Sequence, residues 1–286
     1  MPVNKKTPKA QSPVARIATL LKWLFLGFFV AIALLPLFWL LLNSFKTNLE
    51  LQVSPFALPA VWTLSNYANA IAMAELPRLF ANSLIVAIFS VALNVLACSL
   101  AAFVLSRIVF RGREVLFTVL TAGILVPILS FMVPYFTLIT KVGLYDGLIA
   151  LILVYAAINI PVSIFIITSF MGSIPKELEE AAIIDGCGFV QRYSKIIFPL
   201  SRSGLVTAGT FCFIYAWNEF IMAMLLTSSI ASRTIQLGIR FFTSQFITDY
   251  TSMFAAIILS ILPSVLMYIF LHNKIVSGLT AGAVKG

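Results

Sequence analysis

The stretch from Leu20 to Leu42, LLKWLFLGFFVAIALLPLFWLLL, carries a single charged residue, Lys22. A helix that crosses a membrane needs about 20 predominantly apolar residues, because hydrocarbon offers no hydrogen-bond partner to a stray backbone group. Five later stretches have the same character. With the first, they cover residues 20–42, 81–105, 115–138, 148–170, 204–226 and 254–271. The sequence therefore predicts an all-α membrane protein, with six transmembrane helices in a single domain over residues 1–286.

The composition supports this prediction and excludes several classes of protein. Hydrophobic residues make up 61% of the chain and charged residues 10%, with a mean hydropathy of +1.05. Soluble domains carry about 25% charged residues, so a water-soluble enzyme is excluded. The three cysteines are scattered and there is one histidine, which gives no support to a disulfide framework or a metal site. The net charge of +9 indicates membrane orientation rather than a nucleic-acid partner.

The distribution of basic residues predicts the orientation in the membrane. With six spans both termini share one side, and that side holds fourteen of the nineteen Lys and Arg residues. The positive-inside rule then places both termini in the cytoplasm. The basic N-terminus followed by an apolar run resembles a signal peptide, but the run is too long and no small-residue cleavage site follows it. We therefore expect the first helix to be retained.

The longest cytoplasmic loop, residues 171–203, contains four of the ten acidic residues. Pro175 suits the first turn of a helix and Gly186 suits a helix end, which predicts a short helix from Pro175 to Asp185. A second short helix is expected from Phe189 to about Ile197, ended by Pro199. The first helix can act as a lever that docks on a soluble partner, or it can rest on the membrane surface. Glu177 and Glu179 are expected to be solvated charges.

The string Glu180-Ala181-Ala182-x-x-x-Gly186, followed by Ile196 and Pro199, resembles the EAA loop of ABC importer permeases. One departure is Phe198, where that family usually has leucine. The resemblance implies a type I ABC importer permease fold, in which residues 171–203 form the cytoplasmic loop that couples to the ATPase. The coupling residues it implies are Glu180, Ala181, Ala182, Asp185, Gly186, Ile196 and Pro199.

Several shorter strings resemble the carbohydrate branch of these permeases. They are Ser44-Phe45-Lys46-Thr47, Asn66-Tyr67, Asn82-Ser83, Trp217-Asn218-Glu219-Phe220 and the tail Gly278–Gly286. Together with the loop they cover essentially the whole chain. They are most similar to the second permease subunit of maltose-type, binding-protein-dependent sugar importers, and favour sugar over amino acid or phosphate as the solute.

The resemblance also implies partners and residue roles. The partners are a homologous second permease, two ATPase subunits that hold the ATP and Mg²⁺, and an extracytoplasmic sugar-binding protein, all at a bacterial inner membrane. This chain would bind lipid but no cofactor, metal or nucleic acid, and would have no catalytic residue. Glu180 would pair with a basic residue of the ATPase, Ala181 and Ala182 would let the helix enter a groove there, and Gly186 would make the turn. The tail can reach between the ATPase subunits or fray.

The acid placed furthest inside a predicted span is Glu219. Ionisable groups in a span usually face a cavity or a partner group. Tyr215, Trp217 and Asn218 lie within about one turn of it, and a carboxylate, an amide and aromatic faces suit a sugar path. The alternative is a structural role for Glu219. Asn94 and Asn159 are expected to make helix–helix hydrogen bonds. Helix kinks are expected at the prolines within spans, Pro127, Pro134, Pro161 and Pro263.

Three other functions stay open on the sequence. One is an importer permease for a different small solute, such as an amino acid, a polyamine or phosphate. A second is a secondary transporter driven by an ion gradient, which predicts internal repeats that the two halves do not obviously show. A membrane-embedded enzyme is remote, because no paired acids or metal cluster are present. No GxxxxGK[ST] phosphate-binding motif occurs, so nucleotide energy would have to come from another polypeptide.

Overall fold

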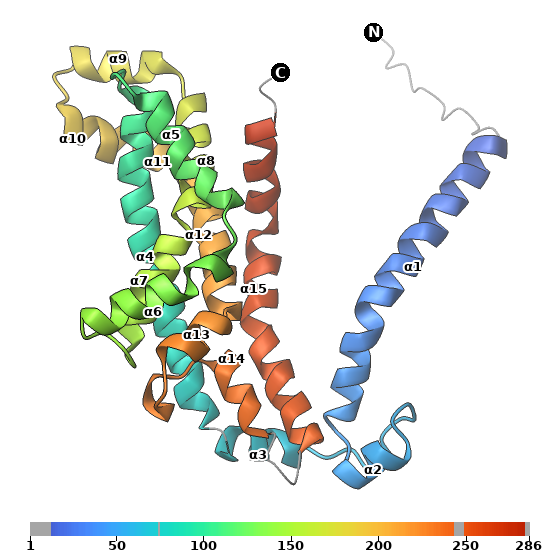
Figure 1. Ribbon diagram of the computed structural model, residues 1–286. Helices are drawn as coiled ribbons and strands as arrows, with labels where there is room; N and C mark the ends of the chain where they lie inside the picture. The colour runs from blue at the N-terminus through green and yellow to red at the C-terminus, as the bar shows by residue number, and fades with distance from the viewer. Residues whose placement is uncertain (1–12, 74, 243–248, 284–286) are drawn as a thin grey trace.

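The computed structural model describes residues 13–73, 75–242 and 249–283, and these are almost entirely helical, without a β-strand among them (Figure 1). Within these residues, three helices are long enough to cross a membrane uninterrupted. They are α1 (Pro13–Asn43), α4 (Leu76–Arg107) and α15 (Tyr250–Ala283). Pro263 lies inside α15 without breaking it, so the kink expected there is not a break in the helix.

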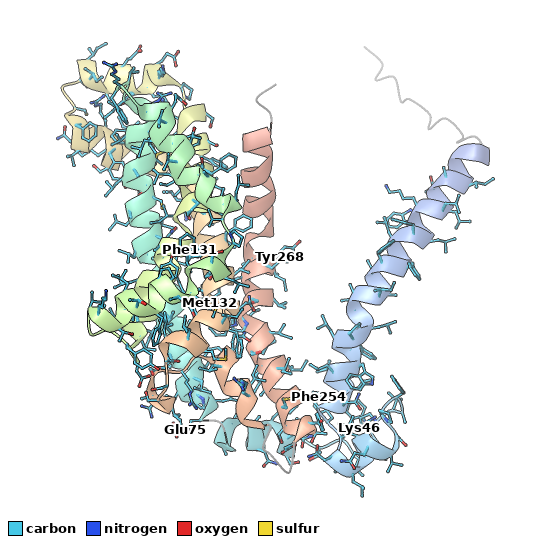
Figure 2. All side chains as sticks on the ribbon, viewed as in Figure 1. Lys46, Glu75, Phe131, Met132, Phe254 and Tyr268 are labelled. Carbon is cyan, nitrogen blue, oxygen red and sulfur yellow. The ribbon has the colours of Figure 1, made fainter. Side chains whose placement is uncertain are left out.

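The third and fourth predicted spans are each two helices joined at a bend. Helices α5 (Arg113–Ala122) and α6 (Met132–Lys141) meet at an angle of 101°, through the 3₁₀ turns η1 (Gly123–Leu125) and η2 (Ile128–Phe131). Helices α7 (Leu148–Ile158) and α8 (Ile160–Ser173) meet at 50°. The kinks expected at Pro127 and Pro161 are confirmed, because both prolines lie at these bends and cannot donate a backbone hydrogen bond. Phe131 and Met132, at the start of α6, are labelled near the middle of the bundle in Figure 2.

The fifth predicted span also ends early. Helix α12 (Arg202–Asn218) stops before Glu219, whose backbone is extended, and the short helix α13 (Ile221–Leu226) follows. The continuous helix expected over 204–226 was therefore wrong at its outer end. On the cytoplasmic side, the helical stretch Phe189–Leu200 meets α12 at 74°. If each bent pair counts as one span, the described residues contain six candidate spans, which confirms the predicted six-helix fold.

The connecting segments separate into two ends of the molecule (Figure 1). The start of α1 and the end of α15 lie at the same end as α9 (Lys176–Ile184) and α10 (Phe189–Gln191). At the opposite end lie α2 (Asn48–Val53), α3 (Ser65–Met73), η4 (Ile230–Ser232), α14 (Ile235–Gly238) and η5 (Ile239–Phe242). This arrangement agrees with a coupling loop on the same side of the membrane as the start of α1 and the end of α15.

Helix α4 is the central element, and it packs against α7, α8 and α12. Three of its side chains, at spacings of four residues, bond to the carbonyls of α7 and α8 around their bend. These are Ser90 to Ile152, Asn94 to Ala156 and Cys98 to Ile160. Asn94 also accepts a 2.6 Å bond from Ser163, so its expected helix–helix role is confirmed. Asn159 instead donates to Tyr155 within its own preceding helix, so that expectation was wrong.

Helix α1 stands apart from the other helices, and no residue of its most apolar stretch is buried within the chain (Figure 1). It meets the bundle at its outer end, where the ring of Trp39 lies 5.5 Å from that of Phe254 at the start of α15. Lys46, labelled with Phe254 in Figure 2, is fully buried there and donates a 2.8 Å bond to the carbonyl of Ser54. The apolar face of α1 is therefore left to lipid or to another protein.

Candidate coupling loop and substrate path

The first helix of the coupling loop, α9, has well-defined ends. Pro175 precedes it and two glutamates occupy its first turn, where the positive end of the helix dipole stabilises them. At the other end Gly186 has a φ of +82°, which an L side chain rarely adopts. Its N–H donates to Ile183 and the N–H of Cys187 donates to Ala182, which forms a Schellman motif. The geometry thus supports the turn predicted at Gly186.

The two faces of α9 differ sharply. Glu180, Ala181 and Asp185 are exposed, and so is Ile184, which has 86% of its surface accessible. Ile183 and Val190 of the same loop are exposed as well, and a group of exposed apolar side chains is typical of an interaction surface. Ala182 points the other way and is buried within the chain, so in this conformation it packs against its own bundle rather than against a partner.

Glu179 is not a solvated charge, which corrects the expectation from the sequence. Its side chain is only 10% exposed, and its Oε1 accepts a 2.9 Å bond from Nη1 of Arg192. Its Oε2 lies 3.7 Å from Nε of Arg107, the last residue of α4. A buried carboxylate must have such partners, because an unpaired charge would be very costly there. Glu177, by contrast, is exposed as expected.

The second half of the coupling loop is a continuous helical path. Helix α10 passes into a π-helical turn, η3 (Arg192–Ile197), and then into α11 (Phe198–Leu200). Pro199 therefore does not end the helix, because it sits in the first turn of α11, where a missing N–H costs least. Ile196 and the buried Ile197 belong to the apolar cluster at the cytoplasmic half of the bundle.

Glu219 lies at the break between α12 and α13 and caps the second helix. Its Oε1 accepts from the backbone N–H of Met222 at 2.8 Å, and its Oε2 accepts from that of Ala223 at 3.0 Å. The hydroxyl of Tyr155, on α7, donates to Oε2 at 2.6 Å. All three donors belong to the chain itself, so the geometry favours the structural role for Glu219.

The other residues of the predicted sugar path are placed differently. Trp217 is fully buried, stacks on Phe213 and donates a 2.8 Å bond to the carbonyl of Ser260. The ring of Tyr215 is half-buried, edge-on to that of Tyr155 at 5.8 Å. Asn218 is exposed and lines a cavity of about 400 Å³, together with residues of α14, η5 and α15. Asn218 thus faces a cavity, and its Nδ2 also donates a 2.8 Å bond to the carbonyl of Ile214.

The short strings that suggested a sugar permease hold the outer end together. Asn66 donates to the carbonyls of Ser44 and Lys46 at 2.8 and 2.6 Å, and the hydroxyls of Ser44 and Tyr67 lie 2.7 Å apart. The side chain of Thr47 caps α2. These residues tie the end of α1 to α3.

Asn82 and Ser83, another of these strings, fasten the outer end of α4 to the loop before α14. Asn82 donates to the carbonyls of Ala231 and Arg233, both at 2.9 Å, and Ser83 accepts from the N–H of Ile235 at 2.8 Å. These short motifs thus hold helices and loops of the outer end together, a structural role that the sequence alone did not reveal.

A polar cluster at Asp146 also escaped the sequence analysis. Asp146 lies in the turn between α6 and α7 at a φ of +62° and binds the loop after α13. Burial alone would raise the pKa of its carboxyl group, but hydrogen bonds from Ser232, Ser228 and Ser229 outweigh burial and hold the pKa well below its ordinary value. The aspartate and the serines lie more than eighty residues apart, so no local pattern signals the contact.

Within the described ranges, no three His, Cys, Asp or Glu side chains lie together in a way that could hold a metal ion. The tail Gly278–Gly286 enters the end of α15 as far as Ala283, and its last three residues lie outside the described part of the chain. The structure therefore does not test the role expected of that tail.

Comparison with known proteins defines the class. Residues 94–273 match the family described as "Binding-protein-dependent transport system inner membrane component", and the chain belongs to this family of ABC transporter permeases. A putative ABC transporter permease of Caldicellulosiruptor sp. is 41% identical over 268 residues, covering 93% of this chain and 97% of that protein. Members of the family are membrane components, and their ATPase is a separate subunit.

Several relatives carry solute names. The sulfoquinovosyl glycerol transport system permease SmoH of Agrobacterium fabrum is 36% identical, covering 88% of this chain and 89% of its own. The trehalose/maltose transport system permease MalG of Thermococcus litoralis is 36% identical, over 89% of this chain and 92% of that protein. A chain from the crystal structure of a bacterial ABC transporter that imports alginate superposes with a TM-score of 0.82 at 24% identity, over 93% of this chain and 99% of that one. That likeness shows the type I permease fold.

Proposed function

We propose that this chain is one of two permease subunits of an ATP-driven importer for a sugar or oligosaccharide in a bacterial inner membrane. The observation that carries the proposal is the coupling loop. Helix α9 is held firmly at the cytoplasmic end of the bundle and exposes Glu180, Ala181 and Ile184 away from it. An exposed helix between two spans can receive a rigid-body movement from a soluble partner and pass it to the membrane.

The relatives support a sugar as the solute. Besides the two permeases above, the relatives include a diacetylchitobiose uptake system permease of Streptomyces coelicolor, 32% identical over 89% of this chain. All three relatives are named for sugars or glycosides. We assign substrate contact to Asn218, which is exposed and lines a cavity while its Nδ2 donates to the carbonyl of Ile214 at 2.8 Å. Trp217 is fully buried, and the carboxylate of Glu219 accepts three hydrogen bonds within the chain. Amide side chains bind sugar hydroxyl groups by donating and accepting hydrogen bonds at the same time.

The energy source would be two ATPase subunits that hold ATP and Mg²⁺, while this chain binds no cofactor and performs no covalent chemistry. ATP binding would close the ATPase pair, draw the two α9 helices together and open the cavity outward, and hydrolysis would reset it. The absence of a GxxxxGK[ST] motif from the sequence supports this division of labour. An extracytoplasmic sugar-binding protein would deliver the solute at the end that carries α2, α3 and α14.

Helix α1 supports the presence of a second permease. Its apolar stretch is unburied within the chain and diverges from the other helices (Figure 1). A homologous subunit seated beside α15 would cover that face with packed side chains, which drive helix association in membranes.

The test is purification of the tagged chain in mild detergent, followed by uptake measurements in proteoliposomes. We expect an ATPase subunit and a second permease in a fixed ratio, with sugar uptake that requires internal ATP and the binding protein. Neutral, sulfonated and acidic sugars should be compared with amino acids, polyamines and phosphate. Uptake by the chain alone on an ion gradient would replace this proposal with a secondary transporter. ATP-driven uptake of a solute other than sugar would retain the importer and reject the substrate class.

A further inference from the structure

Arg107, at the cytoplasmic end of α4, is among the most deeply buried charges in the described part of the chain. Its side chain is 3% exposed. Its Nη2 donates to the carbonyl of Met171 and, at 2.9 Å, to that of Ile174, at the end of α8. Carbonyls at the end of a helix lack the usual helical donor, and the helix dipole favours a cation there; the carbonyl of Met171 also accepts the N–H of Ile174 at 3.3 Å. Arg107 therefore fixes the end of α8 to the end of α4.

The same guanidinium also reaches the coupling helix. Its Nε lies 3.7 Å from Oε2 of Glu179, and Oε1 of Glu179 accepts from Arg192 at 2.9 Å. One buried carboxylate on α9 is therefore held between a cation from α4 and a cation from η3. We call Arg107, Glu179 and Arg192 the buried clamp.

Two further contacts continue the attachment along one face of α4. The hydroxyls of Ser99 and Tyr193 lie 2.8 Å apart, and the ring of Phe103 lies 5.0 Å from that of Phe189 and 5.4 Å from that of Tyr193. The α4 residues 99, 103 and 107 are four apart and so share a face. Both halves of the coupling loop therefore dock on the last two turns of α4, which is not their neighbour in sequence.

We propose that Arg107 and Arg192 are positioning residues that join α9 and the end of α4 into one rigid body. A movement delivered to α9 then reaches α4 directly through Glu179, rather than only through the chain on either side. This inference rests on the proposed function, because it assumes that a partner ATPase moves α9.

The segments that connect α9 to its neighbouring helices can bend, so transmission of its movement to α4 needs a further contact such as the buried clamp. Before α9 the chain leaves the helical conformation at Ile174 and Pro175, and after it the chain turns at Gly186. Such joints can absorb a displacement, because a few residues between two elements accommodate large changes in φ and ψ. A buried, charge-assisted contact resists displacement, because moving apart would leave an unpaired charge in the interior.

Helix α4 is also suited to carry the movement to the outside. It has 32 residues and is about 48 Å long at 1.5 Å per residue. Its outer end binds the loop before α14 through Asn82 and Ser83. The clamp and these two residues lie at opposite ends of one uninterrupted helix, so a shift of α9 has a direct path to the solute-entry side.

The experiment uses the assembled complex with Arg107→Gln, Arg192→Gln and Glu179→Gln. The matched control is Glu177→Gln, which removes an exposed carboxylate from the same helix. The quantities measured are subunit stoichiometry, ATP hydrolysis and sugar uptake in proteoliposomes. We expect the control to keep the wild-type ratio of sugar imported to ATP hydrolysed. The clamp variants should hydrolyse ATP but import about tenfold less sugar per ATP, within the range of coupling changes seen for such contacts.

Two additional variants separate a positioning role from a general loss of stability. Glu179→Asp keeps the charge and should recover part of the ratio. The double variant Arg107→Gln with Glu179→Gln should lose less than the sum of the two single variants, because the contact between these two residues is removed in both. If Arg107→Gln does not assemble, Arg192→Gln and Glu179→Asp carry the test, since Arg192 is a more exposed partner.

A measurement that needs no ATP keeps this inference separate from the proposed function. Hydrogen exchange of the α9 amides is followed on the purified full chain in detergent. It should accelerate in the clamp variants and not in Glu177→Gln. Unchanged exchange, or a wild-type ratio of uptake to hydrolysis in assembled clamp variants, would overturn the inference. A wild-type complex without ATP-driven uptake would instead refute the proposed function, while the exchange result would still decide whether the clamp holds α9.

Discussion

Substitution of Glu219 distinguishes a structural carboxylate from one that binds sugar. The carboxylate accepts hydrogen bonds from Tyr155 at 2.6 Å, Met222 at 2.8 Å and Ala223 at 3.0 Å. Glu219→Ala leaves these three donors without their acceptor, and each unsatisfied buried donor costs about 1–3 kcal/mol. Partial relaxation and water entry reduce the sum, so we expect a loss of about 3–5 kcal/mol in the free energy of unfolding.

Two milder variants test the same contacts. Glu219→Gln keeps the shape and one acceptor but sets an amide NH₂ group against a backbone N–H, so we expect a loss of about 1.5–3 kcal/mol. Tyr155→Phe removes one donor and leaves the cap of α13 in place, so its effect should be smaller than that of Glu219→Ala. Asn218→Ala, at the adjacent exposed position, should leave stability within about 0.5 kcal/mol of wild type.

The assay combines unfolding in mixed detergent micelles with the KM for uptake. A structural role predicts that Glu219→Gln lowers stability, and that whatever complex assembles keeps a nearly normal KM. A sugar-binding role predicts a higher KM with unchanged stability. A change in unfolding free energy below about 0.5 kcal/mol for Glu219→Gln, together with a raised KM, would refute the structural reasoning.

Three further predictions follow from local geometry. Gly186→Ala places a side chain at a φ of +82°, so the free energy of unfolding should fall by about 1–2 kcal/mol and less ATPase should copurify. Gly188→Ala is the control, because its φ of −69° suits any residue, and it should be neutral. Equal effects of the two substitutions would contradict the turn at Gly186. In Gly204→Ala the new Cβ would lie 2.5 Å from Cγ of Phe170, so the free energy of unfolding should fall by about 1–3 kcal/mol. An unchanged free energy of unfolding would mean that α8 and α12 are not in contact at this point. Asp146 has a folded pKa below its ordinary value of 3.8, so its stabilising contribution is present above about pH 4 and is lost as the pH falls toward the folded pKa. Asp146→Asn should remove that acid-dependent part of an unfolding titration, and an unchanged titration would show that the serine contacts do not form.

The helices were predictable to different degrees for physical reasons. Continuous helices such as α4 follow from local apolar runs, because the bilayer permits few other structures. The bend at residues 126 and 127 was signalled by proline, but its angle of 101° was not, because the angle depends on what the two halves pack against. The break at Glu219 had no proline to signal it. Its carboxylate satisfies the N–H groups of the new helix with help from Tyr155 on α7, a contact between distant parts of the chain.

The candidate site shows the same division. The turn at Gly186 and the exposed position of Glu180 could be read from local sequence, since helix ends depend on neighbouring residues. The pairing of Glu179 could not be read in this way, because its partner Arg107 lies more than seventy positions earlier, at the end of another helix. A glutamate beside other glutamates looks solvated until tertiary packing places a cation against it.

The sequence by itself therefore determined the class of protein, the number of spans and the place of the helical loop between the fourth and fifth spans. These depend on hydrophobicity, charge balance and short-range backbone preferences, all of which act within one segment of the chain. Only the tertiary structure decided which polar residues bond to other helices and which are exposed to a partner or a solute. Glu179 and Glu219 are held by groups from other helices, while Glu180 and Asn218 remain exposed. Burial and hydrogen bonding are relations between distant segments, and they exist only once the helices have packed together.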